Sequence, residues 1–173
     1  MGMNVVYPGT GRTESAIVDA AHLYLSYGLR PVPAWAVRPD GPCSCPRGTD
    51  CARPGKHPRS VHAGPGPQDY SWKPLACTTH AEVDQRFASD GQYAAANLML
   101  AIPEGMLVID QDFDDGGLQA ITALAGELGD LPATLSHGTP HGTHRIYRTP
   151  PGWTTRAWVG KDPKNPLDRK SVV

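Results

Sequence analysis

The segment MLVIDQD at residues 106–112 joins a run of apolar, strand-forming residues to two carboxylates. This composition predicts a buried β-strand. Alternate side chains of a strand project from the same face, so Asp110 and Asp112 are expected to project together. Neighbouring carboxylates repel each other unless a cation lies between them, and hard oxygen ligands favour Mg²⁺ or Mn²⁺. A solvated acidic turn is the alternative, and the D-x-D pattern alone leaves both interpretations open.

Other apolar runs surround this segment, and strands are predicted at residues 29–35, 97–102, 106–110, 134–136 and 144–147. The turn residues Pro103-Glu104-Gly105 predict that the second and third of these runs pair as a hairpin. The glycine-rich residues 138–142 predict a second pair from the last two runs. Pro31 and Pro33 indicate that the first run is an irregular or edge strand.

Apolar periodicity predicts three helices, at residues 13–27, 79–89 and 118–128. Thr13 can cap the first helix, and Gly28 stands where a C-terminal cap glycine belongs. Thr79 and Glu82 have the spacing of a capping box at the start of the second. The third has leucines and alanines on one face. Helices and strands together predict an α+β fold.

Residues 38–70 are rich in proline, glycine, cysteine and histidine and have no periodicity. A structureless loop of this length is unusual in a compact domain, and a metal is therefore expected to organise it. Cys43, Cys45, Cys51 and His57 have the spacing C-x-C-x5-C-x5-H, which fits a closed, tetrahedral structural Zn²⁺ site. His62 is an alternative fourth ligand, and unliganded cysteines are the alternative to the site. Cys77 stands apart and is expected in the core.

The chain has 173 residues with a net charge of -1, so no global basic charge indicates nucleic acid. Residues 145–173 hold seven basic and two acidic side chains, which fits either a phosphate-facing segment or a solvated tail. A secretion signal and a membrane-spanning run are both lacking, so a cytoplasmic location without membrane contact is expected. A reducing compartment argues against disulfides.

The segment TPHGTHRIY at residues 139–147 brings a histidine into a strand after a glycine turn. His144 can donate a hydrogen bond to a phosphate oxygen, and Arg145 adds a permanent charge. A surface histidine is the alternative. A second alternative is that the segment forms another metal site, which includes His137 and His141.

Taken in order, these motifs resemble the N-terminal primase–polymerase (prim-pol) domain of the archaeo-eukaryotic primase superfamily. The resemblance covers roughly residues 15–148 and rests on the segments Tyr27–Pro33, Cys43–Pro58, Ala96–Leu98, Val108–Asp112, Leu131–Thr134 and Gly142–Tyr147. It implies one partial prim-pol domain over residues 1–173, with an RRM-like mixed or antiparallel sheet, flanking helices and a zinc-binding insertion at about 38–70.

The resemblance also implies template-directed nucleic-acid synthesis from nucleoside triphosphates on a single-stranded DNA template, in plasmid, phage or bacterial replication. Asp110 and Asp112 would hold catalytic Mg²⁺ or Mn²⁺, and His144 would contact the incoming triphosphate. Nucleotide or nucleic-acid contacts are expected from Asn97, Arg145, Lys56 and Arg53. A replicative helicase is an expected partner.

Two departures from the family pattern matter. His141 replaces a glycine that usually precedes the histidine motif, and the third acidic motif is not found, since Asp162 and Asp168 match it poorly. A C-terminally truncated chain is therefore expected. The alternative function is a catalytically inactive, zinc-stabilised module that binds nucleotides or nucleic acid. A structural zinc protein without a nucleic-acid role is a third interpretation.

Overall fold

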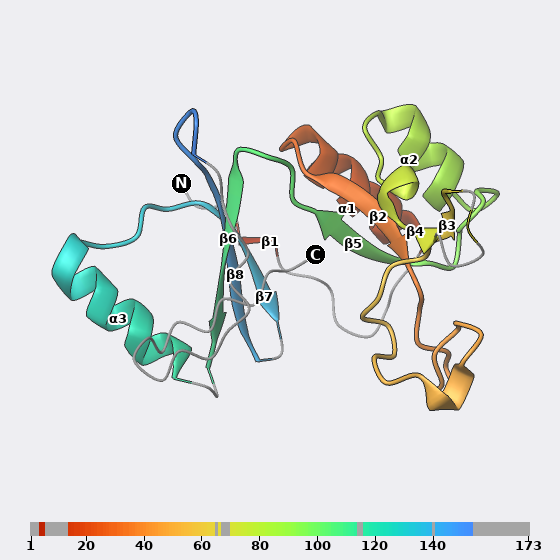
Figure 1. The fold of residues 1–173 in the computed structure, drawn as a ribbon, viewed down its shortest axis with the longest axis horizontal. Helices are drawn as coiled ribbons and strands as arrows, with labels where there is room; N and C mark the ends of the chain where they lie inside the picture. The colour runs from red at the N-terminus through yellow and green to blue at the C-terminus, as the bar shows by residue number, and fades with distance from the viewer. Residues whose placement is uncertain are drawn as a thin grey trace. The chain divides into compact units, whose positions relative to one another are not determined.

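The computed structural model describes residues 4–5, 14–64, 66, 70–113, 116–139 and 141–153 (Figure 1). The chain forms two compact units, one of residues 10–101 and one of residues 1–9 with 102–173. The prediction of a single domain with an insertion at 38–70 stays a prediction. No described helix is both long enough and apolar enough to cross a membrane.

The first helix of the 10–101 unit, α1, spans Glu14–Ser26, close to the predicted range. Thr13, its predicted cap, lies outside the described residues. Gly28 adopts a positive φ of 84°, a conformation that glycine reaches without strain. Gly28 N donates to Leu25 O and Leu29 N to Tyr24 O, so the helix ends in the predicted glycine cap.

Strands β2 (Arg30–Ala34) and β5 (Asn97–Ala101) form an antiparallel pair in this unit. The Pro31 and Pro33 carbonyls accept hydrogen bonds from the backbone N–H groups of Cys77 and Arg59. Because N–H and C=O of one strand residue point the same way, the missing proline N–H groups face away from β5. The two prolines therefore fit this strand without removing a hydrogen bond between β2 and β5.

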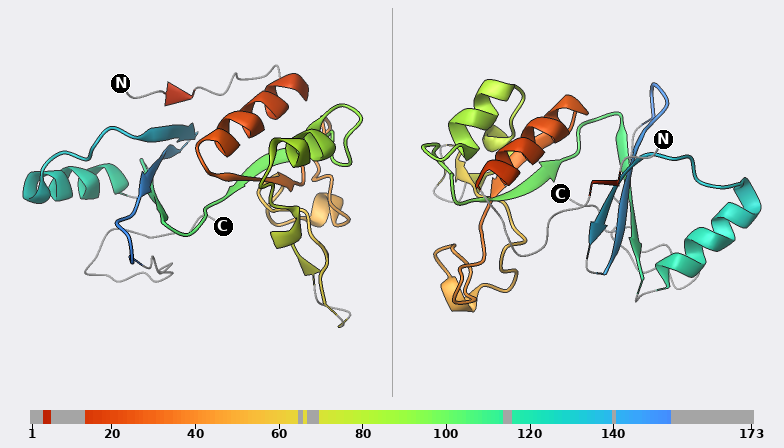
Figure 2. Two further views of the ribbon diagram at one scale, coloured as in Figure 1. Left: turned by 90° about the horizontal axis from the view of Figure 1, so that it is seen from above. Right: turned by 180° about the vertical axis from the view of Figure 1, so that it is seen from behind.

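Helix α2 (His80–Phe87) begins with the predicted capping box between Thr79 and Glu82. It packs against α1 and β2, and Figure 2 shows the two helices side by side in both views. The buried core between these elements consists of Ala21, Cys77, Val83, Phe87 and Ala96. Cys77 is fully buried, which confirms its expected place in the core.

The segment predicted as a long loop is held at both ends of its cysteine-containing part, residues 35–59, which we call the cysteine loop. Trp35 N donates to His57 O at 3.1 Å, and a β-bridge joins Ala34 to Pro58. A 3-10 turn, η1, covers Gly48–Asp50. The later residues form β3 (Val61–His62), β4 (Tyr70–Ser71) and a second 3-10 turn, η2 (Lys73–Leu75).

The other unit contains a four-stranded sheet of order β1-β7-β8-β6 and helix α3. Its elements are β1 (Asn4–Val5), β6 (Met106–Asp112), α3 (Gly117–Leu128), β7 (Leu135–Thr139) and β8 (Gly142–Arg148). β8 pairs antiparallel with both β7 and β6, and β1 pairs parallel with β7. This confirms the pair predicted around residues 138–142 and the α+β class.

The predicted hairpin of residues 97–102 and 106–110 is wrong, although both runs are strands. β5 pairs with β2, and β6 pairs with β8 over seven residues. The boundary between the two compact units falls between residues 101 and 102, so the two runs belong to different units. Both strands therefore pair with partners distant in sequence and not with each other.

Helix α3 begins one residue before the predicted range and ends where predicted. None of its described side chains is buried, and Leu118 and Leu128 are 51% and 77% exposed. The helix contacts β6. Its apolar periodicity therefore predicted the helix correctly, although none of its described side chains is fully buried.

Candidate metal centre and carboxylate–histidine face

Four predicted ligands of the cysteine loop converge on one point. The thiol sulfurs of Cys43, Cys45 and Cys51 and a ring nitrogen of His57 all lie within 4.8 Å of one another. His57 Nε2 is 3.5 Å from Cys43 Sγ and 3.4 Å from Cys51 Sγ. Tetrahedral zinc, with bonds of about 2.3 Å to sulfur and 2.0 Å to nitrogen, separates such ligands by about 3.5 Å. The donor set and its spacing therefore fit zinc.

The backbone brings these ligands together through short-range contacts. A β-bridge pairs Cys43 with Val37, and the turn η1 leads to Cys51. Gly55 has φ of 71°, and a Cβ there would lie 2.9 Å from the Val37 side chain. The Asn97 side-chain amide donates to Gly55 O at 3.4 Å, which ties the loop to β5.

The cysteine pKa values differ within the cluster. Burial raises the pKa of Cys43, but hydrogen bonds from the Cys45 and Gly55 backbone and from His57 more than offset it, and the pKa falls to about 6. Burial raises the pKa of Cys51, and the neighbouring Cys43 and Cys45 thiols add to that rise. A metal ligand must be deprotonated, and the lowered pKa of Cys43 favours its thiolate form.

The alternative ligands do not join this cluster. His62 is exposed and packs edge-on against the Tyr70 ring, with centroids 5.3 Å apart. Within the described part of the chain, the Cys43–His57 cluster is the only group of three or more potential ligands close enough to hold one ion. The alternative second metal site at His137 and His141 is therefore not formed there.

A second candidate site lies on the sheet of the other unit, where β6, β8 and β7 run side by side. Asp110 on β6 is paired in register with His144 on β8, and His144 Nε2 lies 3.2 Å from Asp110 Oδ1. Asp112 is the next residue of β6 on the same face. We call Asp110, Asp112, His144 and the β7 residue His137 the carboxylate–histidine face.

Glycine is required where β8 begins. Gly142 is paired with Asp112, and a Cβ at this position would lie 2.1 Å from Gln111 O. No side chain can be accepted so close to a backbone oxygen unless the strands move apart. The close approach of β8 to β6 holds the Asp110–His144 pair in register.

His137 faces His144 from the third strand. The two residues are register partners, and their ring centroids are 5.9 Å apart. Burial lowers the pKa of His137, and the neighbouring His144 lowers it further. The lowered pKa favours the neutral form of His137, which lies beside a histidine that faces a carboxylate.

Arg145 lies on the other face of the sheet from His144, because consecutive strand residues alternate. Its guanidinium donates to Gln111 Oε1 at 3.5 Å, and Gln111 is only 3% exposed. The two residues that the sequence places together in one motif are thus separated by the sheet.

One family model, "bifunctional DNA primase/polymerase, N-terminal", matches residues 20–170. The chain belongs to this family. The match confirms the resemblance drawn from the ordered motifs and extends it nearly to the C-terminus. No curated protein and no solved structure matches the chain. A primase/polymerase type of function follows at the level of the family.

The roles predicted for individual prim-pol residues stay predictions, but their places are clear. Asn97 supports the cysteine loop, and Arg53 and Lys56 are exposed on that loop. Asp162 and Asp168, the poor matches to the third acidic motif of the family, lie outside the described residues.

Sequence reasoning assigned no role on this face to His137 and missed the steric role of Gly142. The signal for both was the strand pair predicted around residues 138–142, because register places Gly142 opposite Asp112 and His137 opposite His144. To place these two residues from the sequence, the exact register of the strand pair must be known, and residue types alone do not specify it.

Proposed function

We propose that this chain performs template-directed nucleic-acid synthesis from nucleoside triphosphates, as a DNA primase/polymerase acting on a single-stranded DNA template. The observation that supports it best is the pairing of Asp110 with His144 on adjacent strands, with Asp112 on the same face. Two oxygen donors beside a histidine are suited to a metal-bound triphosphate. Membership of the prim-pol family supports the same reaction.

In this proposal each residue has a separate task. The Asp110 and Asp112 carboxylates hold Mg²⁺ or Mn²⁺, for which their oxygen donors are suited. The bound ions supply Lewis-acid stabilisation of the charge that develops on the phosphate oxygens. His144, oriented by Asp110, donates a hydrogen bond to the triphosphate. The Gly142 close contact keeps these groups in register.

The metal cluster has a structural role in the proposal. Three thiolates and one imidazole complete a tetrahedral zinc shell and leave no position for substrate. Zinc would therefore fold the cysteine loop without taking part in nucleotidyl transfer.

A second function, a non-catalytic module that binds nucleotides or nucleic acid, is favoured by one observation. Within the described residues, Asp110 and Asp112 belong to no group of three metal ligands close enough to hold one ion. Nucleotidyl transfer with two ions requires a fuller set of donors.

Primer extension and primer synthesis by the whole chain, with Mn²⁺ and a single-stranded DNA template, test the proposal. We expect Asp110→Asn to lower incorporation by about 100-fold or more, since it removes a metal ligand. The matched control is Asp130→Asn, at an exposed position outside the helices and strands, which is expected to leave the rate unchanged.

Equal circular dichroism spectra of the three proteins would show that the unit containing Asp110 remains folded. Wild-type activity that survives Asp110→Asn would contradict the assignment of Asp110. A zinc-loaded wild-type protein that binds DNA but incorporates no nucleotide would establish the non-catalytic function instead.

A further inference from the structure

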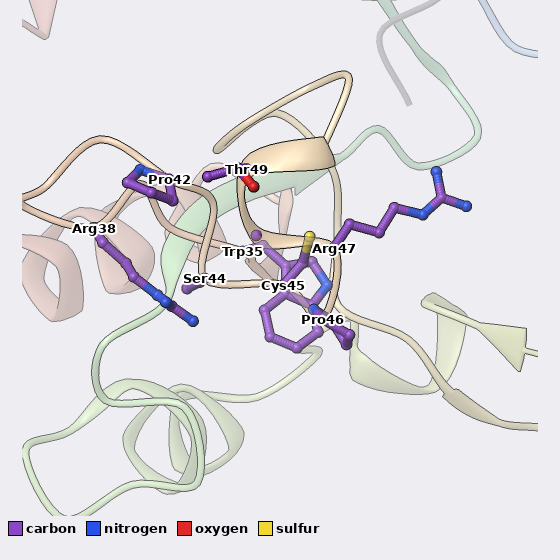
Figure 3. Close-up of a pocket in the computed structure, with 9 residues that line it drawn as sticks. Trp35, Arg38, Pro42, Ser44, Cys45, Pro46, Arg47 and Thr49 are labelled. Atoms are coloured by element: carbon purple, nitrogen blue, oxygen red, sulfur yellow. The ribbon is translucent and has the colours of Figure 1, made fainter.

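Two histidines meet where helices α1 and α2 pack together. His22 lies on α1, and His80 is the first residue of α2. Both views of Figure 2 show the two helices side by side, and both helices belong to the 10–101 unit. None of the functions assigned above uses this pair. The pocket drawn in Figure 3, by contrast, is lined in part by Cys45 and so belongs to the metal cluster.

The two rings approach each other through the same nitrogen. His22 Nδ1 lies 2.7 Å from His80 Nδ1, and the ring planes are inclined by 22°. Two nitrogens that each bind one metal ion at about 2.0 Å are about 2.8 Å apart at a right angle and about 3.3 Å apart at the tetrahedral angle. His80 is exposed, so its ring has room to turn toward a shared ion. The separation of the two nitrogens is therefore close to that of two ligands of one ion.

A carboxylate orients the first of these rings. Asp84 lies four residues after His80 on the same face of α2, and its Oδ1 is 2.8 Å from His22 Nε2. An ionised carboxylate only accepts hydrogen bonds, so His22 Nε2 carries the proton. In the neutral ring the lone pair is then on Nδ1, which is the nitrogen that faces His80. Histidines that bind metals in proteins are commonly held by a carboxylate in this way, which fixes the tautomer and raises the basicity of the ligand.

We propose that His22 and His80 bind one divalent transition-metal ion through their Nδ1 atoms, with Asp84 as the positioning residue. Imidazole nitrogen suits Zn²⁺, Ni²⁺ and Cu²⁺, whereas Mg²⁺ prefers oxygen ligands. Two protein ligands leave positions for water, in contrast to the closed ligand set of the metal cluster. Because the ligands come from different helices, the bound ion fastens α1 to α2 and stabilises the folded 10–101 unit. This site is independent of the proposed polymerase function.

Isothermal titration of the zinc-loaded, tag-free whole chain with nickel chloride tests the proposal. Ni²⁺ is the probe because Cu²⁺ competes more strongly for the ligands of the metal cluster. Excess Mg²⁺ is present throughout to compete for sites built from carboxylate oxygens. We expect His22→Gln and His80→Gln each to weaken Ni²⁺ binding about tenfold or more, since the loss of even an outer hydrogen-bond partner of a ligand has an effect of that size. The control His62→Gln removes an exposed histidine of the same unit outside the pair and should leave the affinity unchanged.

Stability provides a second measurement. The urea midpoint of the wild-type protein should rise when Ni²⁺ is added, because only the folded unit brings the two rings together. The midpoint of His80→Gln should barely respond. Asp84→Asn keeps both ligands but removes the charge that orients His22, so it should bind Ni²⁺ up to about tenfold more weakly and show a smaller rise. A hydrogen bond with a purely structural role predicts instead a lower midpoint without metal in the histidine variants and the same Ni²⁺ affinity in all the proteins.

Equal Ni²⁺ affinity in the wild-type, His22→Gln and His80→Gln proteins, at equal zinc content and with equal circular dichroism spectra, would overturn the proposal. A wild-type protein that binds no Ni²⁺ would overturn it as well. If His22→Gln does not fold, His80→Gln decides the question, because this side chain is exposed at the start of α2. The Asp110→Asn protein separates this proposal from the proposed function, since it should keep the His80-dependent binding of Ni²⁺ whether or not the wild type polymerises.

Discussion

The metal cluster draws its four ligands from residues 43–57 of one loop, whereas the carboxylate–histidine face joins side chains from three strands. The first site is local in sequence, and its loop has little apolar interior of its own to fold around. The second is assembled by strand pairing between residues far apart in the chain. The stability of the first should therefore depend on metal, and that of the second on backbone fit.

Loss of one metal ligand should produce the largest effect. Cys51→Ala is expected to reduce bound zinc from about one ion per chain to nearly none, because three ligands hold zinc far less tightly than four. The cysteine loop should then open, and trypsin should cleave it faster after Arg47 and Lys56, since Arg38 and Arg53 precede prolines and resist trypsin. Metal analysis and timed proteolysis measure these two effects.

Cys77→Ala is the matched control, since this buried thiol lies in the helix core and outside the cluster. It should keep its zinc and its slow cleavage. Equal zinc loss in the two variants, or a wild-type protein without zinc, would contradict the metal assignment.

The steric requirement at the start of β8 should produce the next largest effect. Gly142→Ala places a methyl group 2.1 Å from Gln111 O, so β8 must move away from β6. A cost of about 2–3 kcal/mol in the free energy of unfolding is expected from such overpacking. Urea unfolding followed by circular dichroism measures it.

Gly138→Ala provides the comparison, because it lies on the neighbouring strand β7 and a Cβ there meets no atom within 4 Å. Its effect should stay within about 0.5 kcal/mol. Similar losses in the two variants would show that the close contact at Gly142 does not control the pairing of β6 with β8.

The same difference explains what could be predicted from the sequence. The four ligands of the cluster were predictable because their spacing and residue types carry the information, and His57 was correctly preferred to His62. The helix ends at Gly28 and Thr79 were predictable because caps are local chemistry. In each case the interacting groups lie close together in the sequence.

Strand partners were harder to predict. The run 106–110 was recognised as a strand but paired with the wrong neighbour, because apolar content and a nearby turn do not reveal which distant strand competes for it. The separation of Arg145 from His144 follows from strand alternation. The apolar residues on one face of α3 correctly predicted a helix, but periodicity alone does not reveal that Leu128 is mostly exposed.

The smallest expected effect concerns His137 and tests the electrostatics of the carboxylate–histidine face. Burial, with a contribution from His144, lowers the pKa of His137 in the folded protein below its ordinary value of 6.5. The unfolded chain therefore binds a proton more readily than the folded one. The stability contributed by this residue is fully present above about pH 6.5 and is lost as the pH falls toward the folded pKa.

His137→Gln should reduce the loss of unfolding free energy between pH 7 and pH 5, because glutamine has no proton to bind in this range. His141→Gln is the control, since His141 is exposed in the turn before β8. Urea unfolding at several pH values provides the measurement. A wild-type profile that His137→Gln leaves unchanged would mean that the acid sensitivity of this sheet arises from groups other than the histidine facing His144.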